Sequence, residues 1–404
     1  RLLASHHGLV CLLHEKPFEG INGSGKHNNW SIATDKTNLL DPGESPIDNL
    51  RFLVFLTGVI QAVDDYQELL RMSVASAGND HRLGAHEAPP AIISMFLGDE
   101  LGEVVDALID EHDYTSAERV SVDLGVDVLP NFLKDNTDRN RTSPFAFTGN
   151  KFEFRMPGSA VNLSDCNMIL NTAMAKSLSD FADAMEQVPA EEFEARAIDY
   201  IKAMLTKHQR IIFNGDGYAE EWVEEAKRRG LANHLTTAEA LPCFVDPKSI
   251  ELFERFGVLS ETEVRSRYEV KLEKYTKLLN IEVRTMKRMV LRQFIPAITA
   301  YATDVAQNIN AVMQVSADAP VAQQKGLLNQ LLEGLQTINE ALEDLRSAHR
   351  QGEVIEDGQE RANVYAAEIV PRMDALRRSV DAMEVIVDRK YWPVPSYNEM
   401  LFYV

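Results

Sequence analysis

The stretch KFEFR, residues 151–155, is the most informative strand pattern in the first part of the chain. Charged and aromatic residues alternate in it, which is the side-chain period of a β-strand. The aromatic face would pack in a core, and the face with Lys151, Glu153 and Arg155 would meet either bulk water or a polar cavity. The alternation predicts a strand with one charged face. That face either lines a binding site or is a sheet face exposed to solvent.

A second candidate strand lies upstream, in GINGSGKHNNWS at residues 20–31. His27, Asn29 and Ser31 would share one face, and their imidazole, amide and hydroxyl groups suit a cavity for a cation and a polyphosphate. The segment also nearly matches the phosphate-binding pattern GxxxxGK[ST]. His27 stands where that pattern needs Ser or Thr, and no amphipathic helix follows, so a phosphate-binding loop is disfavoured. The alternative to a ligand role for His27 is that it is a structural histidine within the strand.

Two loops between these strands carry further charged residues. AGNDHRLGAHEAPP, residues 77–90, is rich in glycine, proline and charge, and its Arg82 could clamp a carboxylate. Glu87 lies in the same loop. DRNRTSP, residues 138–144, places Arg141 shortly before the charged strand. Guanidinium groups beside a carboxylate-bearing strand suit an anionic substrate with a magnesium ion, whereas ordinary surface loops are the alternative.

The remaining local patterns predict two short strands and four helices. The apolar run GLVCLL at 8–13 is typical of a buried strand, and AIISMFL at 91–97 is strand-like. Ser45 and Pro46 would cap a helix and supply its first residue. The expected helices cover about 45–76, 99–112, 164–187 and 190–209.

The pattern changes from about residue 261. Two sets of apolar residues repeat at spacings of three and four, from Leu328 to Leu345 and from Ile369 to Val387. Together with a long helix starting near Glu261 they predict a three-helix bundle with internal packing, and kinks can occur at the prolines 296 and 371. We expect three parts: 1–250, a bundle at 251–392 and a tail at 393–404.

The composition of the chain limits the kinds of partner that it can bind. The 404 residues are 45% hydrophobic and 25% charged, as in soluble globular proteins, and carry a formal net charge of −21. That charge argues against nucleic acid or an anionic membrane as partner. The three cysteines are scattered, which fits a reducing cytoplasm. No apolar run is long enough to span a bilayer, and without an initiator methionine the chain is expected to be a fragment.

In this order, the clusters resemble segments of the glutamine synthetase family, and specifically its type III branch. NGSGKH at 22–27 is similar to the family's ATP-region segment, and RLGAHEAP at 82–89 to its glutamate-binding flap. NRTS at 140–143 and KFEFR resemble its NRS and R-x-E-x-R segments. RIIFNGDGYAEEWVEEAKRRGL, from residue 210, extends the resemblance toward the terminal LFYV, so that it covers essentially the whole chain.

The resemblance implies an α+β fold, in which an antiparallel-strand catalytic funnel with outer helices is followed by the helical bundle. It implies ATP-dependent ligation of ammonia to L-glutamate, through γ-glutamyl phosphate, with Mg²⁺ or Mn²⁺ as cofactor. It also implies a homo-oligomer, a dodecamer of two hexameric rings, with sites at subunit interfaces. Glutamate, ammonium and ATP would be the small-molecule partners.

The metal and nucleotide roles also follow from the resemblance. His27 and Glu153 would ligate the metal that bridges the ATP phosphates. Arg141 would act in catalysis by neutralising charge on the transferred phosphoryl group. The residues expected to contact ATP are His27, Asn29, Ser31, Arg141 and Lys151.

The glutamate pocket is implied in the same way. Arg82 and Arg155 would hold the carboxylates of glutamate, and Asn22 and Gly23 would line the pocket. Glu87 would be the second catalytic residue, closing over the site and taking a proton from ammonium.

The sequence departs from the family pattern in several places. Asn29 stands where many relatives have a second histidine, and the family's second phosphate-binding arginine would fall near Ala146 or Phe147. His86 stands where some relatives have tyrosine. The family's amino-terminal half, which supplies the remaining carboxylate ligands, is missing, so this fragment alone is expected to lack a complete active site.

Two other classes of function remain open from the residues alone. One is a helical oligomerisation or scaffold protein that uses the predicted bundle, which leaves the charged clusters unexplained. The other is a P-loop phosphotransferase, for which Lys26 would be indispensable.

Overall fold

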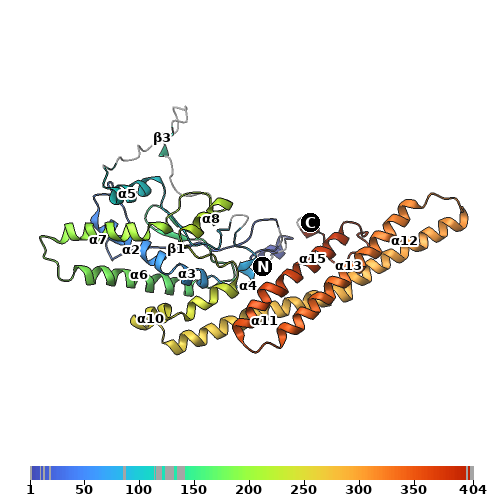
Figure 1. The fold of residues 1–404 in the computed structure, drawn as a ribbon. Coiled ribbons are helices and arrows are strands. Elements are labelled where there is room, and N and C mark those ends of the chain that lie inside the picture. The colour runs from blue at the N-terminus through green and yellow to red at the C-terminus, as the bar shows by residue number, and fades with distance from the viewer. Residues whose placement is uncertain are drawn as a thin grey trace. The chain divides into compact units, whose positions relative to one another are not determined.

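The computed structural model describes residues 2–9, 11, 14–17, 20–84, 88–112, 114, 142–396 and 399–400, and the backbone of 121–122 and 132–133. The chain forms two compact units (Figure 1). The sheet unit comprises Leu13–Tyr268, and the helical unit comprises Glu269–Val404 together with Arg1–Leu12.

A small sheet organises the sheet unit. Its four strands lie in the order β1-β6-β5-β2. They are β1 (Asn28–Trp30), β6 (Phe152–Phe154), β5 (Phe145–Phe147) and β2 (Met95–Phe96). The expected strands at KFEFR and KHNNWS are therefore confirmed, whereas only the last part of AIISMFL pairs. A separate antiparallel pair joins β3 (Ser121–Val122) to β4 (Phe132–Leu133).

The sheet is mixed, which corrects the expectation of antiparallel strands alone. The β1–β6 and β5–β6 pairs are antiparallel, but β2 and β5 are parallel. The connection between β2 and β5 contains helix α5 (Asp99–Asp110), and such a crossover allows two strands to run in the same direction. The fold is accordingly a mostly helical α+β arrangement around a short mixed sheet.

One face of the sheet is an aromatic core. Phe145, Phe147, Phe152 and Phe154 are buried, and the rings of Phe145 and Phe152 stack with centroids 4.9 Å apart. Phe52 of helix α2 (Leu50–Asp65) approaches Phe147 with a centroid distance of 6.2 Å, so the helical layer packs on this face. Because side chains alternate along a strand, the opposite face carries Glu153.

Helices make up most of the sheet unit. They are α2 (Leu50–Asp65), α3 (Gln67–Ser73), α4 (Ala77–Asp80), α6 (Ser164–Met185), α7 (Phe193–His208), α8 (Glu220–Arg228), α9 (Thr237–Ala240) and α10 (Pro247–Arg255). Short 3-10 turns occupy η1 (Gln209–Ile211) and η2 (Leu241–Val245). Helix α2 packs against α6 and α7. The helices expected near 99–112, 164–187 and 190–209 are confirmed within a few residues.

Two local predictions were wrong. Helix α2 is capped by Asn49, whose side chain accepts a hydrogen bond from the Phe52 amide at 3.1 Å, and the helix begins after Ser45 and Pro46. Asn is as strong a cap as Ser, so the later residue takes the role. In the run at 8–13, the described residues are not in a strand, and Leu9 is 59% exposed. A strand needs a neighbour for its backbone groups, and no described strand pairs with this segment.

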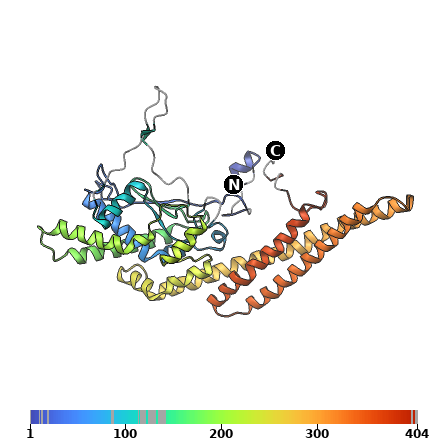
Figure 2. The same cartoon turned by 45° about the horizontal axis from the view of Figure 1, so that its top comes forward.

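The region from residue 261 to residue 384 is almost wholly helical, as predicted. Its elements are α11 (Glu261–Met289), η3 (Val290–Phe294), α12 (Ile295–Val315), α13 (Ala322–Glu353), α14 (Gly358–Val364), η4 (Tyr365–Ile369) and α15 (Val370–Glu384). Helix α13 packs against α12 and α15, and the three lie side by side in Figure 1 and Figure 2. A short helix α1 (Leu2–His6) lies at the amino terminus. Among the described residues, no helix combines the length and the apolarity that crossing a bilayer would require.

Both prolines in these helices follow a π-helical turn. The turn η3 ends two residues before Pro296, and η4 ends two residues before Pro371. Proline lacks an amide hydrogen and its ring clashes with the carbonyl four residues earlier, which disfavours the ordinary α-helical bond. The wider π turn accommodates this defect without ending the helix.

His349 gives the helical unit a predicted pH dependence. Its side chain is 1% exposed, its Nε2 lies 2.9 Å from Asn280 Oδ1, and its Nδ1 lies 3.3 Å from Lys287 Nζ and 3.6 Å from a Glu353 oxygen. Burial, and after it the charge of Lys287, lowers the pKa of His349 below the ordinary 6.5. Below pH 6.5 the unfolded chain therefore binds a proton that the folded chain does not, and the free energy of unfolding should fall.

Hydrogen exchange of α13 amides between pH 7.5 and pH 5.5 measures this effect, after correction for the intrinsic pH dependence of exchange. We expect the protection of α13 to decline below about pH 6.5. In His349→Gln, which stays neutral, that decline should be largely lost. An equal decline in the variant would contradict the assignment to His349.

Candidate active site

Strands β1 and β6 place the candidate polar residues next to each other. Their antiparallel register sets Asn29 opposite Glu153, so the two side chains share the face away from the aromatic core. His27 directly precedes β1, and period-2 alternation puts it on the same side as Asn29. The short aromatic strand thus presents its one carboxylate beside an imidazole and an amide.

His27 and Glu153 are in direct contact although 126 positions separate them. Nδ1 of His27 lies 2.8 Å from Oε1 of Glu153, and Nε of Arg155 donates a 2.8 Å hydrogen bond to Oε2 of the same carboxylate. The closeness that joint metal ligation requires is confirmed, with Glu153 on β6 and His27 directly before the neighbouring strand β1. The His27 side chain is 34% exposed, that of Glu153 18% and that of Arg155 4%. The cluster therefore runs from the surface into the protein.

Opposing effects set the ionisation of Glu153. Burial raises its pKa, but the hydrogen bonds and charges of Arg155 and His27 together outweigh burial and hold the pKa of Glu153 below its ordinary value. The group is therefore a carboxylate at neutral pH. Arg155 occupies one oxygen and leaves Oε1 directed at His27.

Arg82 is buried and donates its hydrogen bonds to the protein. Nη1 donates to the carbonyl oxygen of Met156 at 2.9 Å, and Nη2 donates to that of Arg155 at 3.1 Å. The guanidinium also packs on Gly25, where an added Cβ would lie only 2.1 Å from Nη2. Because Gly25 has no side chain, Arg82 can lie directly against the backbone of the NGSGK segment.

Two residues that sequence reasoning missed fix this arrangement. Glu15 is 5% exposed, and its carboxylate accepts a 2.8 Å hydrogen bond from the Ala160 amide. Asn79 is fully buried and its side-chain amide donates to the Met156 carbonyl oxygen at 3.0 Å. No pattern in the sequence distinguished Glu15 from its charged neighbours, and none distinguished Asn79.

The loop with Arg82 is also anchored from the other side. Buried Arg71 contacts Asp80 at 3.4 Å, and Asp80 accepts 2.7 and 2.8 Å hydrogen bonds from the amide and hydroxyl of Thr237. Burial is the largest effect on both charged groups; it raises the pKa of Asp80 and lowers that of Arg71. These bonds connect helix α4 to α3 and to the first residue of α9.

The other predicted site residues are placed as follows. Ser31 donates to Asn38 Oδ1 at 2.8 Å, so its hydroxyl is engaged within the protein. Lys151 lies one residue before β6 and is half-buried. Asn22 is exposed and Gly23 half-buried beside the stem of Arg82. Glu87 and Arg141, together with His86, lie outside the described residues.

The structure excludes a phosphate-binding loop at residues 20–26. The segment after Lys26 is strand β1 and not the helix whose amino terminus would hold phosphate. Nζ of Lys26 donates to the carbonyl oxygen of Val161 at 2.7 Å, which is a structural contact.

The donors at the rim suit a divalent metal ion. An imidazole nitrogen and a carboxylate oxygen converge to 2.8 Å, and both are ligand types that such ions accept. Among the described residues, no group of three or more His, Cys, Asp or Glu forms a ligand set. Magnesium commonly retains water and takes only one or two protein carboxylates, so two protein donors beside a nucleotide are compatible with it.

Comparison with known proteins agrees with this chemistry. Residues 196–313 match the family model described as the glutamine synthetase C-terminal domain. The chain is 43% identical over 407 residues to the type-3 glutamine synthetase of Dictyostelium discoideum, covering 99% of this chain and 55% of that protein. It is 42% identical over 401 residues to the glutamine synthetase of Butyrivibrio fibrisolvens, covering 99% and 57%.

Residues 196–313 are thus similar to a glutamine synthetase C-terminal domain, and the strands that carry the candidate site precede them in the chain. The chain is a homologue of the type III glutamine synthetases along nearly its whole length. The chain spans about half the length of the curated relatives it matches.

Proposed function

We propose that the gene product containing this chain is a glutamine synthetase, which joins ammonia to L-glutamate using ATP. The proposal rests on the contact between His27 and Glu153 within a chain that is 43% identical to a type-3 glutamine synthetase. A helical scaffold would need neither this contact nor the buried arginines behind it.

His27 and Glu153 would hold Mg²⁺ or Mn²⁺ on the nucleotide side of the site. A bound metal supplies charge neutralisation for the ATP phosphates. Arg155 would keep the Glu153 carboxylate ionised and oriented, because its Nε already donates to Oε2 at 2.8 Å. Asn29 and Ser31 would line the same nucleotide side, and Lys151 and Arg141 would contact the phosphates.

Arg82 and Arg155 would recognise glutamate, with Asn22 and Gly23 at the pocket wall. Both guanidinium groups donate hydrogen bonds within the protein, so direct contact with a substrate carboxylate requires some of these bonds to be exchanged. The anchors Glu15 and Asn79 would hold the polypeptide around Arg82 in place during that exchange.

The reaction has two balanced steps. In the first, a side-chain oxygen of glutamate attacks the γ-phosphorus of ATP, and ADP leaves. In the second, Glu87 takes a proton from ammonium and the resulting ammonia attacks the acyl phosphate. The nitrogen then loses a second proton, which the departing phosphate takes up, and the amide and inorganic phosphate are released. Phosphoryl transfer needs positioning and charge neutralisation, which cationic side chains and a metal supply. We further propose a cytoplasmic dodecamer of two hexameric rings.

The full-length gene product, supplied with Mg²⁺, ATP, glutamate and ammonium, tests this proposal. We expect glutamine, ADP and phosphate in equal amounts, and Lys26→Met should retain most of the activity because Lys26 bonds only to backbone. Failure of the full-length protein to bind nucleotide with magnesium would favour the scaffold function, and nearly complete loss of activity in Lys26→Met would contradict the structural role given to Lys26.

A further inference from the structure

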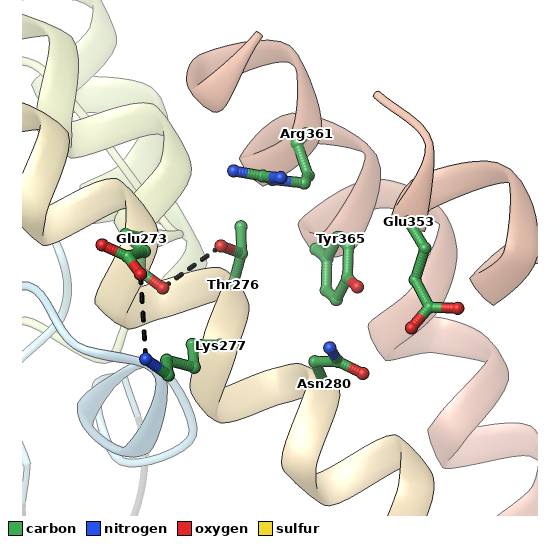
Figure 3. A pocket seen from close by; sticks show the side chains of 7 residues that line it. All are labelled: Glu273, Thr276, Lys277, Asn280, Glu353, Arg361 and Tyr365. Atoms are coloured by element: carbon green, nitrogen blue, oxygen red, sulfur yellow. Dashed lines mark hydrogen bonds and ion pairs between the residues drawn. The ribbon is translucent and has the colours of Figure 1, made fainter. Parts of the chain in front are cut away.

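The helical unit contains a polar cavity that the proposed ligase reaction does not use. Its volume is about 390 Å³, and its walls come from α11, the end of α13 and the segment α14–η4 (Figure 3). This size lies within the roughly 300–1,000 Å³ of typical small-molecule sites. Both positive and negative side chains line it.

Arg361 is the main cationic group of this cavity. In the described part of the chain, no carboxylate lies within ion-pair distance of its guanidinium, and its buried Nε has no hydrogen-bond partner. Other arginines of the unit differ: Arg284 contacts Glu353 at 2.7 Å and Arg389 contacts Glu399 at 2.7 Å. Orphaned buried donors are rare in native proteins, so the unused Nε points to a partner from outside the chain.

Tyr365 adds a hydroxyl donor to the same cavity. Its ring is 2% exposed, and Figure 3 shows it between Arg361 and Asn280. Burial, and after it the charge of Glu353, raises the pKa of Tyr365, so the hydroxyl keeps its proton. Tyr365 begins the π turn η4, and π turns inside α-helices frequently mark functional sites.

Glu273 supplies negative charge on the opposite wall. Its carboxylate is 3.7 Å from Lys277 Nζ, and both of these side chains are largely exposed, which makes a weak pair. Glu353 also lines the cavity, but its carboxylate is engaged by Arg284 at 2.7 Å. In Figure 3, Glu273 and Arg361 come from different helices and lie on either side of the open space.

We propose that this cavity binds a small zwitterion of the free α-amino-acid class. The ligand carboxylate would bind Arg361 and the hydroxyl of Tyr365, and the ligand ammonium would bind Glu273. A guanidinium suits a carboxylate because it can donate two parallel hydrogen bonds. A polyanion is disfavoured, since Glu273 and Glu353 both line the walls.

Calorimetric titration of the 404-residue chain with single amino acids tests the site. Glutamate and glutamine are left out because the proposed ligase site would also bind them. We expect at least one amino acid to bind, and its N-acetyl and carboxamide derivatives, which each lack one charge, to bind at least about tenfold more weakly.

Variants locate the binding. Arg361→Lys keeps the charge but loses the two-pronged donor, and Tyr365→Phe keeps the ring but loses the hydroxyl. Each should weaken binding by roughly tenfold or more. Arg378→Lys, at an exposed arginine of α15, is the matched control and should bind normally. No binding of any amino acid at 10 mM, unchanged binding in Arg361→Lys, or tighter binding of inorganic phosphate would each overturn the proposal.

Discussion

Replacing Glu153 with glutamine is expected to reduce glutamine formation by the full-length protein roughly a hundredfold or more, and to weaken magnesium-dependent nucleotide binding. The carboxylate is held between His27 Nδ1 and Arg155 Nε, each at 2.8 Å, and is ionised at neutral pH. Glutamine keeps the shape of the side chain and an acceptor for Arg155. It removes the negative charge that a divalent ion requires.

Glu103 provides the matched control for this experiment. It lies on helix α5 and contacts His112, just beyond the end of that helix, at 3.1 Å, so it reproduces a Glu–His pair; its side chain is 38% exposed. Glu103→Gln should leave both nucleotide binding and turnover unchanged. Glu153→Ala is the harsher variant, because it leaves the buried Arg155 guanidinium without this acceptor, a loss of roughly 1–3 kcal/mol in stability. Normal magnesium-dependent nucleotide binding in Glu153→Gln would show that the contact between Glu153 and His27 is only structural.

Alanine at Glu87 is expected to impair the second step of the reaction and to spare the first. Ammonium has no lone pair, so a base must remove its proton before attack on the acyl phosphate. Losing a positioned general base typically costs roughly a hundredfold or more, and glutamine formation should fall by that amount. With ATP and glutamate, the variant should still release ADP.

Hydroxylamine separates the two steps. It attacks without prior deprotonation, so it should restore part of the turnover of Glu87→Ala. His86→Ala is a neighbouring control and should keep most of the ammonia-dependent rate. A variant that fails to form ADP, or one that makes glutamine at the normal rate, would remove Glu87 from the proposed mechanism.

Local patterns predicted most of the secondary structure. The alternation at 151–155 and the apolar repeats after residue 261 correspond to β6 and to the packed helices α13 and α15. Local sequence could not show that β2 pairs parallel to β5, because that pairing depends on where the crossover through α5 places the strand. The helix start at Asn49 was missed for a simpler reason, since two adequate capping residues lie close together.

The candidate site was predictable only in part. Alternation showed that Glu153 and Arg155 share a face, but the contact of Glu153 with His27 came from the resemblance to a known family. Neither source showed that Arg82 would be enclosed by the backbone of residues 155–157. Such a contact depends on how segments distant in sequence pack, and it leaves no periodic pattern in the sequence.

Mn²⁺ bound with ADP to the full-length protein tests the central claim most directly, through pulsed electron paramagnetic resonance. If His27 and Glu153 hold the metal, the spectrum should show coupling to a histidine nitrogen. That coupling should disappear in His27→Ala and persist in His234→Ala, whose imidazole contacts Glu68 at 2.8 Å elsewhere in the sheet unit. A spectrum without nitrogen coupling, or one unchanged in His27→Ala, would contradict the metal site.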